Sequence, residues 1–118
     1  MQSRLQALGR LKTGTMNATE ARYEADVLKP MLHAGQILWY RFEGIKLRLA
    51  DNTFLTVDFP VMGADGQLRM IDVKGGLAVI SDDARVKMKV AADQYPFAFS
   101  MVYPRKKKLG GGWEVIEL

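Results

Sequence analysis

The fold of this protein is decided by residues 56–76, which read TVDFPVMGADGQLRMIDVKGG. Two apolar segments flank the turn residues 64–66, so the stretch predicts two antiparallel strands joined by a tight turn. Three charged side chains, Asp58, Asp72 and Lys74, lie within these segments. A charge buried on a strand without a partner destabilises the fold, so a compensating role is expected for these three side chains.

The turn also predicts which of these residues face each other. A hairpin centred on residue 65 places Asp58 opposite Asp72, and strand alternation points Asp72 and Lys74 toward one face. Two neighbouring carboxylates repel each other unless a cation or a proton intervenes. Oxygen ligands of this kind suit Mg²⁺, and Mn²⁺ can substitute. The alternative is a cross-strand ion pair of Asp58 with Lys74, with Asp72 exposed.

The segment before this hairpin begins with residues 1–16, which we interpret as a basic N-terminal arm. Asn17 and Glu20 have the spacing of a capping box, which predicts that a helix begins there. Pro30 removes a backbone donor, so it should kink or stop this helix, or leave it one further turn to His33. His33 is the one histidine of the chain and is interpreted as the end of that helix.

Strand patterns cover residues 36–43, run on into 44–50 and recur later in the chain, at 53–62, 67–75, 97–103 and 113–118. Ser81, followed by two acidic residues, predicts a helix that Pro96 ends. The resulting order is α-β-β-β-α-β-β. A helix between the fourth and fifth of these segments predicts a crossover and a parallel strand pair. We therefore expect one α/β domain, of mixed α+β type, over residues 1–118.

The charge of the chain favours an anionic partner. The net charge is +4, and the cations gather in two places. These are Arg85, Lys87 and Lys89, and then Arg105, Lys106, Lys107 and Lys108. They predict DNA phosphate contacts, with solvated helix and loop faces as the alternative. Arg41, Lys46 and Arg48 form another set, interpreted first as a solvated strand face.

Other features bear on location. The chain has no cysteine, which excludes disulfides and thiolate zinc sites. No apolar run approaches the roughly 18 residues that span a bilayer. Residues 1–12 contain no uninterrupted apolar segment of the secretory type. We expect a cytoplasmic protein without a membrane partner.

Several segments together resemble the PD-(D/E)XK nuclease superfamily, in particular its small phage-encoded, Holliday-junction-resolvase-like members. The core motif reads TVDF, then a turn, then IDVKG. MNATEARYEADV resembles the first helix of such nucleases, and SDDARVKMKVAADQYP resembles the helix after the catalytic strand. The resemblance implies a restriction-endonuclease-like core, in which helices flank a central mixed β-sheet.

The resemblance also implies roles for individual residues. The metal ligands would be Glu20, Asp58, Asp72 and the backbone carbonyl of Val73. Lys74 would be the catalytic lysine. The accessory position would be taken by Lys87 or by Gln94, and the sequence leaves both open.

The sequence departs from the pattern of this superfamily at four places. Val57 stands where the motif has proline, Asp72 where glutamate is more frequent, and Gly76 with Leu77 where an aromatic residue is expected. Pro30 inside the first helix is the fourth. Glu20 has the alternative role of closing the capping box alone. The Asp72 side chain is one methylene shorter than glutamate, so we expect a different metal geometry and weaker activity.

The function implied by the resemblance is a divalent-metal-dependent DNA endonuclease. Structured or branched DNA in phage metabolism would be its substrate, in the bacterial host cytoplasm if the chain is phage-encoded. A homodimer would suit the symmetric cleavage of a junction. The alternatives are a non-catalytic DNA-binding protein on the same scaffold, or a small interaction module.

Overall fold

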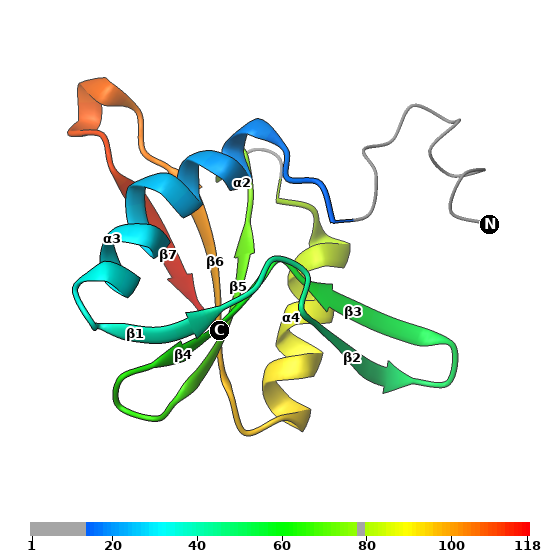
Figure 1. Cartoon of the computed structure of the whole chain (residues 1–118). Helices are drawn as coiled ribbons and strands as arrows, with labels where there is room; N and C mark the ends of the chain where they lie inside the picture. The colour runs from blue at the N-terminus through cyan, green and yellow to red at the C-terminus, as the bar shows by residue number, and fades with distance from the viewer. Residues whose placement is uncertain (1–13, 78–79) are drawn as a thin grey trace.

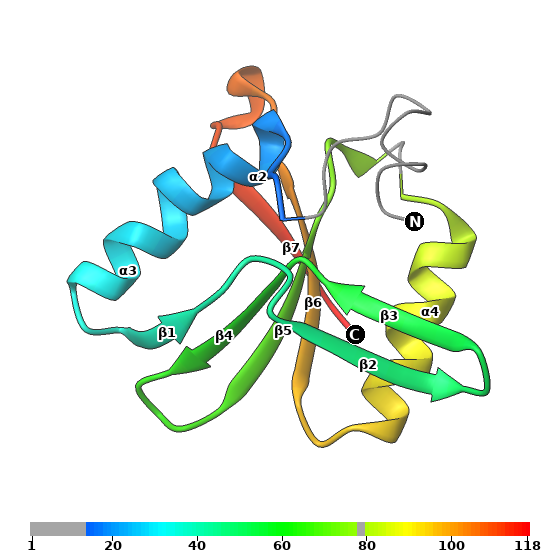
Figure 2. The same ribbon diagram turned by 45° about the vertical axis from the view of Figure 1, so that its right-hand side comes forward.

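The computed structural model describes residues 14–77 and 80–118, which form a five-stranded sheet, a two-stranded sheet and helices packed against them (Figures 1 and 2). In chain order the elements are α2 (Ala18–Tyr23), η1 (Glu24–Leu28), α3 (Lys29–His33), β1 (Ile37–Tyr40), β2 (Ile45–Ala50), β3 (Thr53–Val57), β4 (Phe59–Gly63), β5 (Leu68–Val73), α4 (Asp82–Gln94), β6 (Ala98–Pro104), η3 (Lys107–Leu109) and β7 (Trp113–Glu117). The predicted arm at residues 1–16 lies outside this description except for its last three residues. No helix in the described ranges is long and apolar enough to cross a membrane.

The main sheet has the order β1-β4-β5-β6-β7 and is mixed. Strands β5 and β6 are parallel, and the other neighbouring pairs are antiparallel. Helix α4 connects the two parallel strands, as a crossover requires. The mixed α+β class and the parallel pair are therefore confirmed.

The predicted single strand over residues 53–62 is wrong, because the chain changes sheets in its middle. Strand β3 ends at Val57 and pairs with β2 in the two-stranded sheet. Strand β4 begins at Phe59 and pairs with β1 and β5 in the main sheet. Asp58 is the one residue between them, and its carbonyl accepts a hydrogen bond of 2.7 Å from the Glu43 N–H, which closes the base of the β2–β3 hairpin.

The strand region predicted over residues 36–50 is also divided, and it forms two strands in place of one. Residues 36–50 separate into β1 and β2 at a turn where Glu43 has a positive φ of 52°. Five strands therefore precede α4, and the predicted order α-β-β-β-α-β-β has two strands too few. The periodicity is similar on both sides of each division, so it does not reveal where the chain changes partner.

The predicted register of the central hairpin is confirmed. Phe59 lies opposite Ile71 and Pro60 opposite Met70, which continues to Asp58 opposite Asp72. The turn contains Gly66 at a φ of 82°, a conformation that favours glycine. A two-strand unit of this kind has its register set by the turn, so the sequence prediction could be accurate.

The first helix begins as predicted but does not stop at Pro30. The Asn17 side chain accepts from the Glu20 N–H at 2.8 Å, and Glu20 Oε1 accepts from the Asn17 N–H at 2.8 Å. A π-helical turn, η1, precedes Pro30, and the chain continues as α3 to His33. A widened turn next to a residue without an N–H lets the helix pass this position.

Each face of the main sheet has its own apolar core. Helices α2 and α3 cover one face (Figure 1), where the buried residues are Tyr23, Leu28, Ile37, Phe59, Val61, Ile71, Val73 and Val102. Helix α4 and the β2–β3 hairpin cover the other, where Leu47, Leu49, Val57, Met70, Met88, Ala91, Phe99 and Met101 are buried. Asp72 alternates with Met70 and therefore lies on the α4 side of the sheet.

Candidate functional site

The Asp58 side chain, just before β4, accepts the hydrogen bond of a β5 residue that has no partner on β4. Its Oδ2 accepts a hydrogen bond of 2.9 Å from the N–H of Val73. Because β4 begins opposite Ile71, it is too short to pair with Val73, and the carboxylate takes that place. The division between β3 and β4 thus fixes the Asp58 side chain beside the carboxyl end of β5.

Asp72 and Lys74 lie at the same strand end. Asp72 is 7% exposed, and its Oδ2 lies 3.1 Å from the Lys74 Nζ. The predicted alternative, in which Asp72 is exposed and Lys74 pairs with Asp58, is wrong. The ammonium group instead neutralises the more buried carboxylate, as burial of a charge requires.

Asp72 is close enough to Asp58 for its charge to change the ionisation of the Asp58 carboxyl group. Burial, then the negative charge of Asp72, raises the pKa of Asp58 from 3.8 to about 8, although the Val73 N–H acts in the opposite direction. The charge of Glu20 raises this pKa further. An environment that disfavours the ionised form of a carboxyl group favours a bound cation or a proton at that group.

These side chains open into a cleft of about 560 Å³. It lies between the end of β5, strand β3 and the first turns of α4, and its lining residues are Leu55, Thr56, Asp58, Asp72, Lys74, Asp83, Ala84, Val86, Lys87 and Met88. The structure therefore brings Lys87 to the two predicted carboxylates. Thr56 and Asp83 were not predicted; the alternation 54, 56, 58 along one strand was the signal for Thr56.

Glu20 is not gathered with them into a three-carboxylate group. Its Oε1 accepts from the Asn17 N–H, so the capping role is confirmed, while its charge still acts on Asp58. Among the described residues, no three or more His, Cys, Asp or Glu side chains form a group that could hold a metal ion. A role for Glu20 as a ligand stays a prediction.

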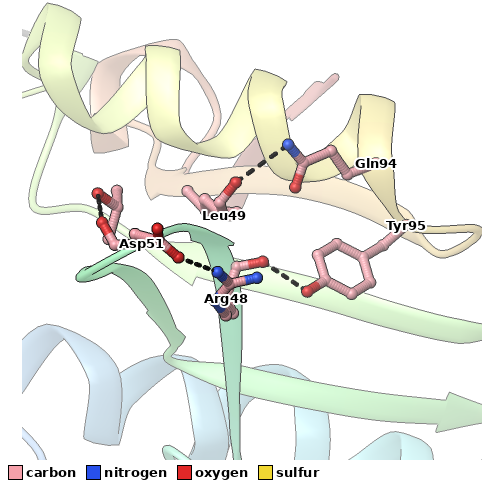
Figure 3. Close-up of polar contacts among 6 residues, drawn as sticks. Arg48, Leu49, Asp51, Gln94 and Tyr95 are labelled. Atoms are coloured by element: carbon pink, nitrogen blue, oxygen red, sulfur yellow. Dashed lines mark hydrogen bonds and ion pairs between the residues drawn. The ribbon is translucent and has the colours of Figure 1, made fainter.

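Gln94 lies at the other end of α4 from the cleft. It lies seven positions after Lys87, which is roughly 10 Å along a helix. Figure 3 shows that its Nε2 donates to the Leu49 carbonyl at 3.2 Å, while the Tyr95 hydroxyl donates to the Arg48 carbonyl at 2.6 Å. Both carbonyls lie near the end of β2. Gln94 therefore fastens the hairpin to α4, and of the two predicted accessory residues only Lys87 reaches the cleft.

This difference predicts opposite results for two alanine variants. On the endonuclease prediction made from the sequence, Lys87→Ala should lower DNA cleavage at least about 10-fold. Its melting temperature should change little, because an exposed side chain carries little stability. Gln94→Ala should leave the rate of cleavage unchanged and destabilise the fold by about 1 kcal/mol. Initial rates at saturating DNA and thermal unfolding test both. A loss of cleavage in Gln94→Ala at unchanged stability would contradict this assignment.

The predicted DNA-binding cations lie in the β6–β7 loop and on α4, and they differ in whether they are paired, exposed or near the cleft. Arg105 is paired, since its Nε donates to Glu114 Oε1 at 2.7 Å. Lys106, Lys107 and Lys108 are exposed in the β6–β7 loop. Because β5 and β6 are parallel, this loop lies at the sheet edge where β5 ends (Figure 2). Arg85 and Lys89 are on α4 but do not line the cleft.

The comparisons with known proteins add no further constraint on this site. No family model matches the chain, and neither a curated protein nor a solved structure matches it.

Proposed function

We propose that this protein is a divalent-metal-dependent DNA endonuclease that hydrolyses phosphodiester bonds. The observation that carries the proposal is the meeting of Asp58, Asp72 and Lys74 in one cleft, with Lys87 on its opposite wall. The hydrogen bond from the Val73 N–H accounts for one oxygen of Asp58 but not for a second carboxylate facing it, and burial beside that charge raises the pKa of Asp58 to about 8. A carboxyl group whose pKa is perturbed in this way, and which lies in a cleft, is typical of a functional site.

The residues present fit a hard cation such as Mg²⁺ or Mn²⁺. Mg²⁺ commonly uses one or two carboxylates and completes its coordination with water and substrate phosphate. Asp58 and Asp72 supply two carboxylates, and the adjacent Val73 carbonyl is the proposed third protein ligand. A bound metal would neutralise both charges and remove the electrostatic cause of the raised Asp58 pKa.

The topology supports the same proposal. A strand pair carrying the two acids, a helix, and then a strand parallel to the second of them follow each other along the chain. This is the arrangement expected of a restriction-endonuclease-like core, to which we assign the domain. The β2–β3 hairpin precedes that arrangement and lies between β1 and β4 in the chain.

Each side chain then has a distinct role. Asp58 and Asp72 would hold a metal, which would supply Lewis-acid stabilisation of the charge that develops on the phosphate. The Val73 N–H orients Asp58. Lys74, which pairs with Asp72 in the free protein, turns its ammonium group toward the attacking water or the scissile phosphate. Lys87 contacts a phosphate oxygen from α4.

The test is cleavage of labelled duplex, single-stranded, flap and four-way-junction DNA with Mg²⁺, with Mn²⁺ and with EDTA. We expect products with either metal and none with EDTA. The preferred substrate would identify the DNA structure on which the protein acts. Binding without cleavage in both metals would contradict the proposal.

The raised pKa gives a second, activity-independent prediction. Below pH 4 the folded and unfolded states both keep the Asp58 proton, and between pH 4 and pH 8 only the folded state keeps it. Stability without metal should therefore fall across this range and be regained on metal binding, which requires the ionised form. We expect Mg²⁺ to raise the melting temperature more at pH 8.5 than at pH 6.

Asp58→Asn is the matched variant for this measurement. It keeps an oxygen acceptor for the Val73 N–H but cannot ionise. We expect it to melt above the parent protein at pH 8.5 without metal, by about 5 °C, and to lose the response to Mg²⁺. Asp93→Asn, on the exposed side of α4, should behave as the parent does. An equal response to Mg²⁺ in Asp58→Asn would place the metal elsewhere.

One observation favours a non-catalytic DNA-binding protein as the second candidate. The Lys74–Asp72 ion pair already neutralises one carboxylate without any metal. On that alternative the cations of the chain would still bind phosphates, and binding would weaken steeply with salt. Binding that does not depend on salt would exclude both and leave an interaction module.

A further inference from the structure

We propose that the outer face of the β2–β3 hairpin binds unpaired bases of the DNA strand next to the cleaved phosphate. This surface consists of Lys46, Arg48, Phe54 and Thr56, and we call it the hairpin face. The inference rests on the proposed function, because it assigns the substrate class of the same cleft. It is carried by an exposed aromatic ring between two cations, on a strand that leads into that cleft.

The composition of the hairpin face follows from strand alternation. Leu47, Leu49 and Val57 point inward and are buried against α4 and the main sheet. The alternate side chains point outward, and their register places Lys46 opposite Thr56 and Arg48 opposite Phe54. The outward row therefore contains no acidic side chain on either strand.

Phe54 has the exposure and the neighbours of a stacking platform. Its side chain is 42% exposed, although phenylalanine usually lies inside. The Lys46 Nζ lies 4.8 Å from the ring centroid. The Arg48 guanidinium forms a solvent-exposed ion pair with Asp51. Stacking a base on an aromatic ring is stronger than an exposed cation–π contact, so a base can displace Lys46 toward a phosphate.

The hairpin face is continuous with the proposed catalytic cleft. Phe54, Thr56 and Asp58 follow one another at alternate positions, so the Cα atoms of Phe54 and Asp58 lie roughly 13 Å apart along an extended chain. Thr56 is itself part of the cleft lining. A strand whose phosphate lies at Asp58 would therefore pass over Thr56 and reach Phe54.

The hairpin is held in a fixed position, as a preformed platform requires. The Glu43–Asp58 hydrogen bond closes its base, and Gln94 and Tyr95 bind the Leu49 and Arg48 carbonyls near its other end (Figure 3). Both anchors leave the outer face uncovered. A rigid, cationic, aromatic-bearing strand surface suits single strands, because bases in a duplex have no free π-face to offer.

The test measures DNA binding by fluorescence anisotropy. The buffer contains EDTA, so that no metal-dependent cleavage occurs. The probes are a single-stranded oligonucleotide, the matching duplex, and that duplex with an unpaired tail. For Phe54→Ala we expect about 10-fold weaker binding of the single strand and the tailed duplex, with the blunt duplex changed less than about 2-fold. Phe54→Leu should lose the same affinity, and Phe54→Trp should retain it.

Two further variants complete the design. Trp39→Ala is the matched control, since Trp39 is a 41% exposed aromatic residue on β1, away from the cleft. It should bind all three probes as the parent protein does. Lys46→Ala should weaken all probes and reduce the slope of log affinity against log salt by about 1.

The outcomes separate this inference from the proposed function. An unchanged single-strand affinity in both Phe54→Ala and Phe54→Leu, or an equal loss on the blunt duplex, would overturn the hairpin assignment even if the protein cleaves DNA. The selective loss in a protein that cuts nothing would support the hairpin face and remove the nuclease.

Discussion

Replacing Asp72 with Asn should lower metal-dependent cleavage at least about 100-fold. Lewis-acid stabilisation by a metal contributes several kcal/mol to the transition state, and each 1.36 kcal/mol is a factor of ten in rate. Asp72 is the more buried of the two carboxylates and the one that Lys74 contacts. Its loss therefore removes a proposed ligand and the partner that positions the lysine. Single-turnover cleavage in Mg²⁺ is the measurement.

The same substitution should not destabilise the fold at pH 8, which separates a chemical defect from unfolding. The negative charge of Asp72 raises the pKa of Asp58, so removing that charge relieves repulsion between the two groups. This gain opposes the loss of the ion pair with Lys74. We expect a melting temperature close to that of the parent protein, with Asp93→Asn active as the control. Retained cleavage in Asp72→Asn would contradict the metal site.

The second large effect is expected at Phe59, the residue that follows Asp58. Its side chain is fully buried, and its ring centroid lies 5.4 Å from that of Phe42, 6.0 Å from that of Tyr23 and 6.1 Å from that of Tyr40. Phe59→Ala should reduce the free energy of unfolding by about 3–5 kcal/mol, because such a substitution leaves a cavity that the core fills only in part. Denaturant unfolding tests this.

Phe54→Ala is the matched control for that experiment. It makes the same substitution on a neighbouring strand but at an exposed position, so the change should stay below about 1 kcal/mol. Phe59→Leu should fall between the two. A Phe59→Ala protein that unfolds at the denaturant concentration of the parent would mean that this aromatic cluster does not hold β4 in place.

The sequence was sufficient to predict the centre of the site. A tight turn sets the register of the two strands beside it, so the turn at Ala64–Gly66 was enough to place Asp58 opposite Asp72. The capping box and the parallel strand pair also depend on local signals or on one connecting helix. Each of these predictions needed only residues that are near one another in the chain.

Other parts of the fold depend on partners that are distant in the chain. Residues 53–62 form one continuous strand pattern, yet their first half pairs with β2 and their second half with β1 and β5. One local signal was present, because Pro60 lacks the N–H that a central strand position normally uses. The role of Gln94 had no such signal, since it depends on a carbonyl 45 positions away.

Because the base of the β2–β3 hairpin is closed by a hydrogen bond, the length of the hairpin can change without moving the site. The Glu43–Asp58 hydrogen bond fixes where the hairpin leaves the main sheet, while Asp51 and Asn52 form an exposed turn at its tip. Lengthening both strands at that tip by two residues would extend the arm by roughly 6.6 Å without moving Asp58. A longer hairpin would therefore let the proposed hairpin face span more nucleotides, while the proposed metal site stays the same.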